Sequence, residues 1–207
     1  MIRAILAGQK TQTRRVVHNP HRNDGGFVLQ DYGKGFWPYR SHDGDSGFYL
    51  DRQKGGDYYS EAPLRCPYGQ PGDRLWVREA WAAPHSEDGR PPRAIQCDQM
   101  RIHYAATEDR GGLLWRPSIH MPRWASRITL EITGVRVERL QDISEADARA
   151  EGAPPSHPSI NAISREYGFP DFPRSWYGQL WDQINGAGGW DANPWVWVVE
   201  FKRTEAA

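Results

Sequence analysis

The sequence has few of the residues that mark secreted, metal-binding or membrane proteins. Its two cysteines, Cys66 and Cys97, are far apart and lack a CxxC partner, which argues against a disulfide framework and against a zinc site. The seven histidines show neither HxH nor HxxxH spacing, so they predict no metal site. No apolar run approaches membrane length, and no signal peptide is visible. We therefore expect a reduced, cytoplasmic protein with no metal, no cofactor and no membrane partner.

The chain also lacks a net charge, because 26 lysines and arginines balance 26 aspartates and glutamates. Without a global positive field, sequence-independent binding to long nucleic acid is not favoured. A local basic patch, or a small uncharged ligand such as a nucleoside, remains compatible with this composition.

Tryptophan, in contrast, is abundant, with ten copies among 207 residues. Such large side chains can build a core from few residues, and their flat faces can also stack on bases. Core packing is the expectation for most of them.

The hydrophobic pattern predicts short strands and a few helices. Strands are expected at residues 10–17, 74–79, 102–105, 127–140 and 195–202, and helices at residues 1–7, 144–151 and 176–184. This order predicts one barrel-like α+β domain over residues 1–207.

Local signals fix several boundaries. Gly8 is a natural end for the first helix, and Gly134 breaks the longest strand as a bulge does. Ser144 and Asp147 have the spacing of a capping box at the second helix. The third helix has one apolar face, made of Trp176, Leu180, Trp181 and Ile184.

Residues 19–66 have a different composition, rich in glycine, aspartate, tyrosine and arginine, with short apolar islands. We interpret this segment as an insertion of short hairpins or a mobile flap within the single domain.

The segment KTQTRR, residues 10–15, is the first candidate for chemistry. In a strand, its odd-numbered and even-numbered side chains point to opposite faces, although Lys10 at the start could turn to either. A lysine beside a threonine forms a base-and-nucleophile pair when burial lowers the lysine pKa. The alternative is structural: Lys10 complements a helix dipole, and threonine is a good strand former. These six residues alone favour the structural alternative.

Glu151 is the second candidate. A carboxylate in the last turn of a helix opposes the helix dipole, and such local departures from stability rules often mark function. The alternative is a solvated carboxylate that destabilises the helix only slightly. A third set could line a polar cleft or could equally form ordinary surface ion pairs: Arg78, Glu79, Arg116, His120, Arg123 and Arg127. Trp115 is expected in the core or at its rim rather than on a surface that stacks on bases.

Four segments resemble the ASCH-domain family, which is related to the PUA-like RNA-binding barrels. Residues 5–15, ILAGQKTQTRR, resemble its opening ILAGxKTxTxR element, and residues 72–77 resemble its GDxLxV strand entry. Residues 143–151 resemble the helix after the long central strand, and residues 198–201 resemble the closing xVIEF strand. Residues 115–127, WRPSIHMPRWASR, resemble the phage and prophage branch. The resemblance covers about half of the chain and implies a small β-barrel with peripheral helices.

The resemblance also implies an activity. Small bacterial members of this family are amidohydrolases that remove the acetyl group from N4-acetylcytidine. By motif, their catalytic lysine, threonine and glutamate fall on Lys10, Thr13 and Glu151. Lys10 would activate Thr13 to attack the amide carbonyl, Glu151 would orient the lysine or shuttle the proton, and Arg15 would contact the base or the oxyanion. Arg78, Glu79 and Trp115 are the further candidate substrate contacts, and the insertion could act as a lid or admit bulkier acyl groups.

Two other functions stay open: a module that binds RNA or a modified base through the same cleft, and a ribonuclease. The neutral charge argues against both, since each needs phosphate contacts. We expect a monomer whose partner is a small nucleoside, with RNA as the alternative partner. A closed pocket of nucleoside size around Lys10 would favour the enzyme, and an open basic groove would favour the other two.

Overall fold

The computed structural model describes most of the chain. Residues 1–17, 66–95, 100–109, 111–155 and 172–204 are described in full, and for residues 39–40, 46–54 and 57–64 the course of the backbone is described.

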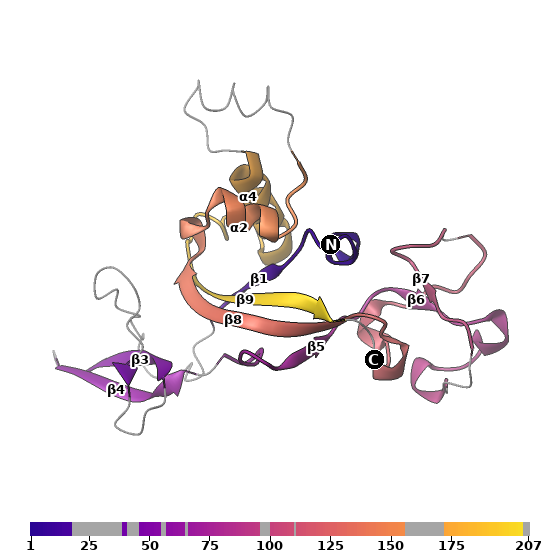
Figure 1. Ribbon diagram of the computed structural model, residues 1–207, viewed down its shortest axis with the longest axis horizontal. Helices are drawn as coiled ribbons and strands as arrows, with labels where there is room; N and C mark the ends of the chain where they lie inside the picture. Colours follow the sequence, from indigo (N-terminus) through magenta and orange to yellow (C-terminus); the bar gives the residue numbers. More distant parts are fainter. Residues whose placement is uncertain are drawn as a thin grey trace.

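The main sheet has four antiparallel strands in the order β1-β9-β8-β5. These are β1 (Gln12–Val16), β5 (Arg74–Trp76), β8 (Thr129–Arg139) and β9 (Trp195–Thr204). The long strands β8 and β9 curl together so that the sheet forms half of a barrel (Figure 1). The fold therefore combines a curled antiparallel sheet with few helices, which agrees with the expected α+β class and barrel-like sheet.

Gly134 lies at an irregularity in the sheet, as its place in the sequence predicts. The β8–β9 register shifts between Ile132 and Gly134, and a β-carbon built on Gly134 would lie 2.7 Å from Oε2 of Glu200. A side chain here would meet the flexible end of the Glu200 side chain on the neighbouring strand, which would have to move. Bulges of this kind bend a strand and increase its twist, which contributes to the curl of the sheet.

Three helices are described in full. The first, α1 (Ile2–Leu6), is followed by Gly8 at φ 70°. The second, α2 (Glu145–Ala150), begins after Ser144, whose hydroxyl accepts a hydrogen bond from the backbone N–H of Asp147. Both predicted boundaries are confirmed. The third helix, α4 (Phe172–Asn185), is longer than predicted.

The buried face of α4 differs from the predicted one. Ile184 is 57% exposed, whereas Tyr177 and Gly178 are buried. The reason is a tertiary contact: a β-carbon on Gly178 would lie 3.1 Å from Cδ2 of Trp190. The indole packs against the bare backbone and turns this side of the helix inward.

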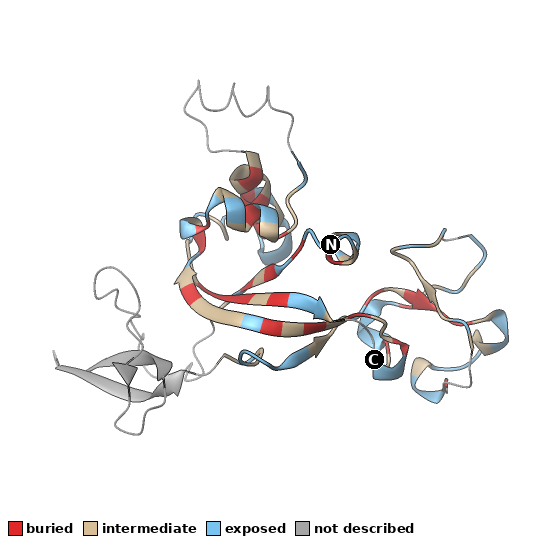
Figure 2. Cartoon of the chain, viewed as in Figure 1, coloured by how far each residue is buried: buried red, intermediate tan, exposed pale blue. Residues whose placement is uncertain are grey.

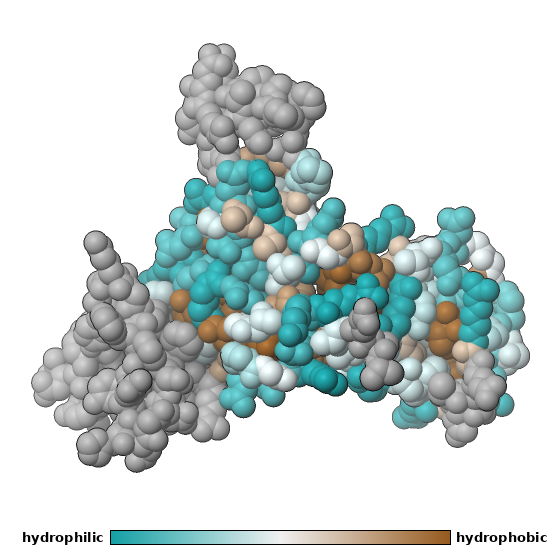
Figure 3. Space-filling view, in the orientation of Figure 1, coloured by the Kyte–Doolittle hydropathy of each residue, from teal (hydrophilic) through white to brown (hydrophobic). Residues whose placement is uncertain are grey.

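In the described part of the chain, the buried hydrophobic residues form three clusters; Figure 2 shows the buried residues in red. One cluster, around Trp181 and Val198, lies between the sheet and helices α2 and α4. A second, around Ile5 and Phe201, joins α1 to the sheet. The third, around Trp81 and Met121, fills a separate lobe. On the face seen in Figure 3, most of the described surface is hydrophilic, with small hydrophobic patches along the sheet and in the lobe.

The lobe contains β6 (Trp81–Ala82) and β7 (His103–Tyr104). Both are shorter than average strands, and the predicted strand at residues 74–79 ends at Trp76. Single 3-10 turns make up much of the rest: η1 (His85–Glu87), η2 (Pro92–Ala94), η3 (Ser118–His120) and η4 (Arg123–Ala125), with η5 (Leu140–Asp142) after β8. Each of the first four begins directly after a proline.

Part of the segment interpreted as an insertion forms a second sheet. Its strands are β2 (Tyr39–Arg40), β3 (Ser46–Lys54) and β4 (Asp57–Leu64), paired antiparallel in chain order. The remainder of residues 19–66, apart from Cys66, lies outside the described residues. Within the described part of the chain, no helix combines the length and the apolar character needed to cross a membrane.

Candidate functional site

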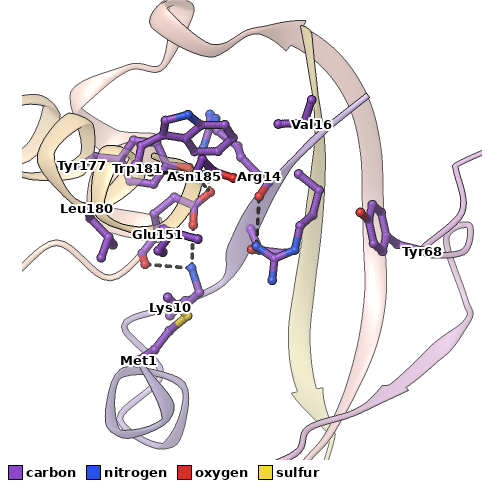
Figure 4. A pocket seen from close by; sticks show the side chains of 13 residues that line it. Met1, Lys10, Arg14, Val16, Tyr68, Glu151, Tyr177, Leu180, Trp181 and Asn185 are labelled. Atoms are coloured by element: carbon purple, nitrogen blue, oxygen red, sulfur yellow. Dashed lines mark hydrogen bonds and ion pairs between the residues drawn. The ribbon is translucent and has the colours of Figure 1, made fainter. Parts of the chain in front are cut away.

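The two positions singled out by the sequence meet in the structure. Lys10 lies two residues before the first residue of β1, and Glu151 is the C-cap of α2. Each is 4% exposed. Nζ of Lys10 lies 2.6 Å from Oε2 of Glu151 and also donates to the Glu151 backbone carbonyl at 2.9 Å (Figure 4). The even-numbered face of residues 10–15 is therefore the buried one, and Lys10 belongs to it.

A close backbone approach brings these residues together. The backbone N–H of Thr11 donates to the carbonyl of Ala150 at 2.8 Å. Gly152 ends α2 at φ 99°, and a β-carbon there would lie 3.3 Å from Cβ of Ala4 and 3.5 Å from Cβ of Lys10. Glycine satisfies both requirements, since it adopts positive φ without strain and has no side chain to displace Lys10.

The second carboxylate oxygen of Glu151 has two other partners. Nη1 of Arg14 lies 3.3 Å from Oε1, and the hydroxyl of Tyr177 donates to the same atom at 3.4 Å. Arg14 is 1% exposed and Tyr177 is 4% exposed. The glutamate at the end of α2 is thus held by β1 on one side and by α4 on the other.

Behind Arg14 lies a wider polar network. Arg14 Nε donates to Oε1 of Glu138 at 2.9 Å, and Nη2 lies 3.5 Å from Oδ2 of Asp147. Gln12 donates to Oδ1 of Asp147 at 2.9 Å. Arg136 contacts Glu138 and Asp147 from the more exposed side. Buried arginine is tolerated because its charge and its donors are matched by acceptors.

The surroundings alter the proton affinities of the Lys10 and Tyr177 side chains. Burial lowers the pKa of Lys10; the Glu151 carboxylate opposes this effect, and the positive charges of Arg15 and Arg14 reinforce it. Burial and the neighbouring Glu151 raise the pKa of Tyr177, whose phenol stays protonated. Lys10 is therefore closer to the neutral form than an ordinary lysine.

A cavity with a volume of about 140 Å³ opens beside the ion pair. Its lining includes both the polar groups and apolar side chains from α1, β1 and α4: Met1, Lys10, Thr13, Arg14, Arg15, Val16, Tyr68, Glu151, Tyr177, Leu180, Trp181, Ile184 and Asn185 (Figure 4). Two of the exposed apolar residues of the chain, Met1 and Ile184, belong to this lining. Of the predicted site residues, the structure thus brings together Lys10, Thr13, Arg15 and Glu151.

Thr13 and Arg15 reach the cavity from the other face of β1. This is possible because β1 is the edge strand of the sheet, so a cavity beside it is accessible from both faces. Thr13 is half-buried and Arg15 is exposed. Among the described residues, none forms a hydrogen bond with the Thr13 hydroxyl.

The other predicted substrate contacts are not in this lining. Glu79, 2% exposed, forms a two-pronged ion pair with Arg127, with N–O distances of 2.9 and 3.0 Å. The Arg78 guanidinium lies over the Trp76 ring, 4.6 Å from its centroid. These residues follow β5, at the end of the sheet that carries the β6–β7 lobe (Figure 1). Trp115 is half-buried and precedes Arg116, which bridges to Trp81 in that lobe.

Sequence reasoning did not identify Arg14 or Tyr177 as site residues. The signal for Arg14 was its place on the same strand face as Lys10. Tyr177 gave no such signal, because its position depends on how α4 packs.

Comparison of the chain with known protein families, with curated proteins and with solved structures finds no match. Among the described residues, no group of three or more histidine, cysteine, aspartate or glutamate side chains is placed to hold a metal ion.

Proposed function

We propose that this chain is an amidohydrolase with an ASCH or PUA-like barrel, which removes the acyl group from N4-acylated cytosine nucleosides, as in N4-acetylcytidine to cytidine. One observation carries the proposal: a buried Lys10–Glu151 pair opens into a cavity that Thr13 and Arg15 also line. The curled antiparallel sheet, with α2 and α4 packed at one end, supports the fold assignment.

The proposed reaction is acyl transfer through Thr13. Neutral Lys10 takes the proton of the Thr13 hydroxyl while the oxygen attacks the amide carbonyl carbon. The tetrahedral intermediate collapses with cleavage of the C–N bond, and the lysine ammonium returns the proton to the departing N4 amine. The acyl group is then an ester on Thr13. A water molecule, deprotonated by Lys10, attacks this ester, and the C–O bond to Thr13 breaks. The Lys10 ammonium returns the proton to the departing Thr13 oxygen, which restores the threonine and releases the carboxylic acid. The sum is amide plus water to amine plus acid.

The surroundings of Lys10 favour this role. A general base must be neutral when it accepts the proton, and burial moves the Lys10 pKa in that direction. Glu151 holds Nζ in place at 2.6 Å. Arg15, an exposed cation in the cavity lining, is the candidate for stabilising the negative oxygen of the tetrahedral intermediate.

The size of the cavity favours a small substrate. At about 140 Å³, it is below the roughly 300 Å³ at which pockets for drug-sized ligands begin. It would take the acylated amide and part of the base, while the ribose would lie at the mouth. A nucleic-acid strand would need a longer groove.

The first test is conversion of N4-acetylcytidine to cytidine by the purified protein, followed by the change in ultraviolet absorption. We expect turnover by the wild type and none by Lys10→Ala, Thr13→Ala or Glu151→Ala. Thr11→Ala is the matched control: Thr11 belongs to the same motif but is exposed, and its hydrogen bonds within the described structure are made by its backbone. It should keep full activity.

Two outcomes would change the proposal. Activity retained in Thr13→Ala would exclude the nucleophile and favour direct attack by water. No conversion by folded wild type would overturn the amidohydrolase and make RNA binding and RNA cleavage the next assays.

A further inference from the structure

Glu151 is not the partner of Lys10 alone. Lys10 contacts Oε2, whereas Arg14 and Tyr177 contact Oε1. A carboxylate that faced only Lys10 would concentrate its negative charge on the ammonium and favour the protonated lysine. A carboxylate that also binds a guanidinium favours the protonated lysine less. Part of its negative charge is already compensated, and the guanidinium repels the lysine ammonium.

The choice of cations in the chain supports this distinction. Of the 26 lysines and arginines, only four are lysines: Lys10, Lys34, Lys54 and Lys202. Arginine stays protonated in proteins, whereas lysine can lose its proton when buried. Lys10 is buried in contact with Glu151, while Lys202 has a side chain that is 61% exposed. The buried site thus combines a lysine, which can act as a base, with an arginine, which cannot.

We propose that Arg14 is a positioning residue of this site: by binding the Glu151 oxygen that Lys10 leaves free, it keeps Lys10 available as a neutral base. This rests on the proposed function insofar as Lys10 is the base of that reaction. The effect of Arg14 on the proton affinity of Lys10 is nevertheless measurable without any substrate.

Arg14 is itself fixed from behind. Its Nε donates to Glu138 at 2.9 Å, and its side chain is fully buried. Its guanidinium also lies 5.9 Å from the centroid of the Tyr177 ring. Glu138 and the ring therefore hold the guanidinium in place beside Glu151.

Several charged or titratable groups surround Lys10, and any pH effect has to be assigned among them. These are Arg14 and Arg15 from β1, Glu151 at the end of α2 and Tyr177 from α4. Met1, before α1, and Tyr68, before β5, line the same cavity. Of these, Arg14 is the only cation that contacts Glu151 together with Lys10 among the described residues. Asp147 and Glu138 lie one step further away, on Arg14.

Arg136 provides a matched control. It contacts Glu138 and Asp147, as Arg14 does, at 3.1 and 3.3 Å. No contact joins it to Glu151 in the described structure. Removing Arg136 should disturb the same network without changing the contacts or the charge of the Glu151 carboxylate beside Lys10.

The experiment is a pH titration of the lysine side chains by NMR, with carbon-13 at the ε position. Four lysines give four signals, and the signal that Lys10→Ala removes is that of Lys10. In Arg14→Gln we expect the Lys10 midpoint to rise by about one pH unit or more, because a positive charge is removed and Glu151 is left to Lys10. Arg14→Lys should shift it less, and Arg136→Gln should leave it unchanged.

Kinetics give a second readout of the same change. A midpoint one unit higher reduces the neutral fraction of Lys10 roughly tenfold at pH values below it. The acidic limb of kcat/KM should therefore move to higher pH in Arg14→Gln and remain in place in Arg136→Gln. Loss of activity with an unmoved pH profile is what a merely structural role would produce.

Arg14→Gln leaves Glu138 without its buried partner, so the variant could be unstable. The double variant Arg14→Gln, Glu138→Gln removes both charges and is expected to show the same direction of shift. An unchanged Lys10 midpoint in whichever variant folds would overturn the proposal. A raised midpoint in a protein that does not hydrolyse N4-acetylcytidine would support the role of Arg14 and reject the proposed reaction.

Discussion

Two glutamates are buried near opposite ends of β8, and each is paired with a cation. Glu79, 2% exposed, meets Arg127 just before the strand begins. Glu151, 4% exposed, lies after the strand ends and meets Lys10, Arg14 and Tyr177. The first pair is a symmetrical fork with one partner. In the second, Lys10 contacts one carboxylate oxygen of Glu151, and Arg14 and Tyr177 contact the other.

The difference between the two regions lies in what the cation can do. Arg127 lies over the Tyr104 ring, 3.9 Å from its centroid, and a guanidinium keeps its proton. The Glu79 pair therefore fixes the segment after β5 against the segment before β8. Lys10 has a lowered pKa and opens to a cavity. Burial does not distinguish the two pairs. The proposed catalytic role rests on the lysine, the carboxylate that it shares with Arg14 and Tyr177, and the adjoining cavity.

The largest expected effect comes from exchanging the type of cation at each end. Lys10→Arg keeps the charge beside Glu151 but removes the base, so turnover of N4-acetylcytidine should fall by roughly 10³-fold, within the range of general base catalysis. Arg127→Lys should leave kcat unchanged. Steady-state kinetics on both variants make the comparison.

Appreciable activity in Lys10→Arg would show that the cation acts by its charge alone. The two regions would then be equivalent in kind, and the assignment of Lys10 as a base would fail.

A smaller effect, on stability alone, is expected at the Glu79 end. Arg127→Leu leaves the Glu79 carboxylate buried without its partner, which should lower the free energy of unfolding by about 3 kcal/mol. Urea denaturation measures this, and kcat per folded molecule should not change. Arg101→Leu is the control. The Arg101 side chain is 77% exposed and approaches Glu108 no closer than 4.0 Å, so the free energy of unfolding should fall by less than about 0.5 kcal/mol. Equal losses in both variants would contradict the structural role of the buried pair.

The smallest effect concerns the network behind Arg14. Burial alone would raise the pKa of Asp147, but hydrogen bonds from Gln12 and Ser144, with the charges of Arg14 and Arg136, lower it below its usual value. A carboxyl whose pKa is lower in the folded state stabilises the fold above its unfolded pKa, and this contribution disappears as pH falls through the folded one. Asp147→Asn should therefore be less stable than the wild type at pH 7, by less than about 1 kcal/mol for this partly exposed group.

The pH dependence tests that assignment. The difference in unfolding free energy between wild type and Asp147→Asn should narrow below pH 4 and vanish at lower pH. A gap that stays constant with pH would show that Asp147 acts through packing and not through its charge.

The parts of the fold that the sequence predicted well depend on neighbouring residues. Gly8 follows the first helix, Ser144 caps α2, and Gly134 lies at the bulge; each follows from the conformation or hydrogen bonding of a few adjacent residues. Local patterns singled out Lys10 and Glu151 separately. The family resemblance implied that Glu151 contacts the lysine.

What the sequence did not reveal depends on distant partners. Arg14 is a buried arginine because Glu138 and Glu151 compensate it, and no local pattern contains that information. Tyr177 joins the site, and Ile184 stays exposed, because Trp190 packs on Gly178 and sets the rotation of α4. Arg78 and Glu79 were expected near the substrate, yet the strand ends before them and they lie toward the β6–β7 lobe.

The pairing of β1 has a consequence for how the protein is made. In the described structure β1 is bonded only to β9, with Gln12 opposite Glu200. The strand that carries Thr13 and follows Lys10 therefore has no sheet to join until β9 has left the ribosome. At about 5–20 residues per second, translation of the intervening chain takes on the order of ten to forty seconds. Until then β1 cannot take its place in the sheet, so the strand position that holds Thr13 in the folded protein is completed late in synthesis.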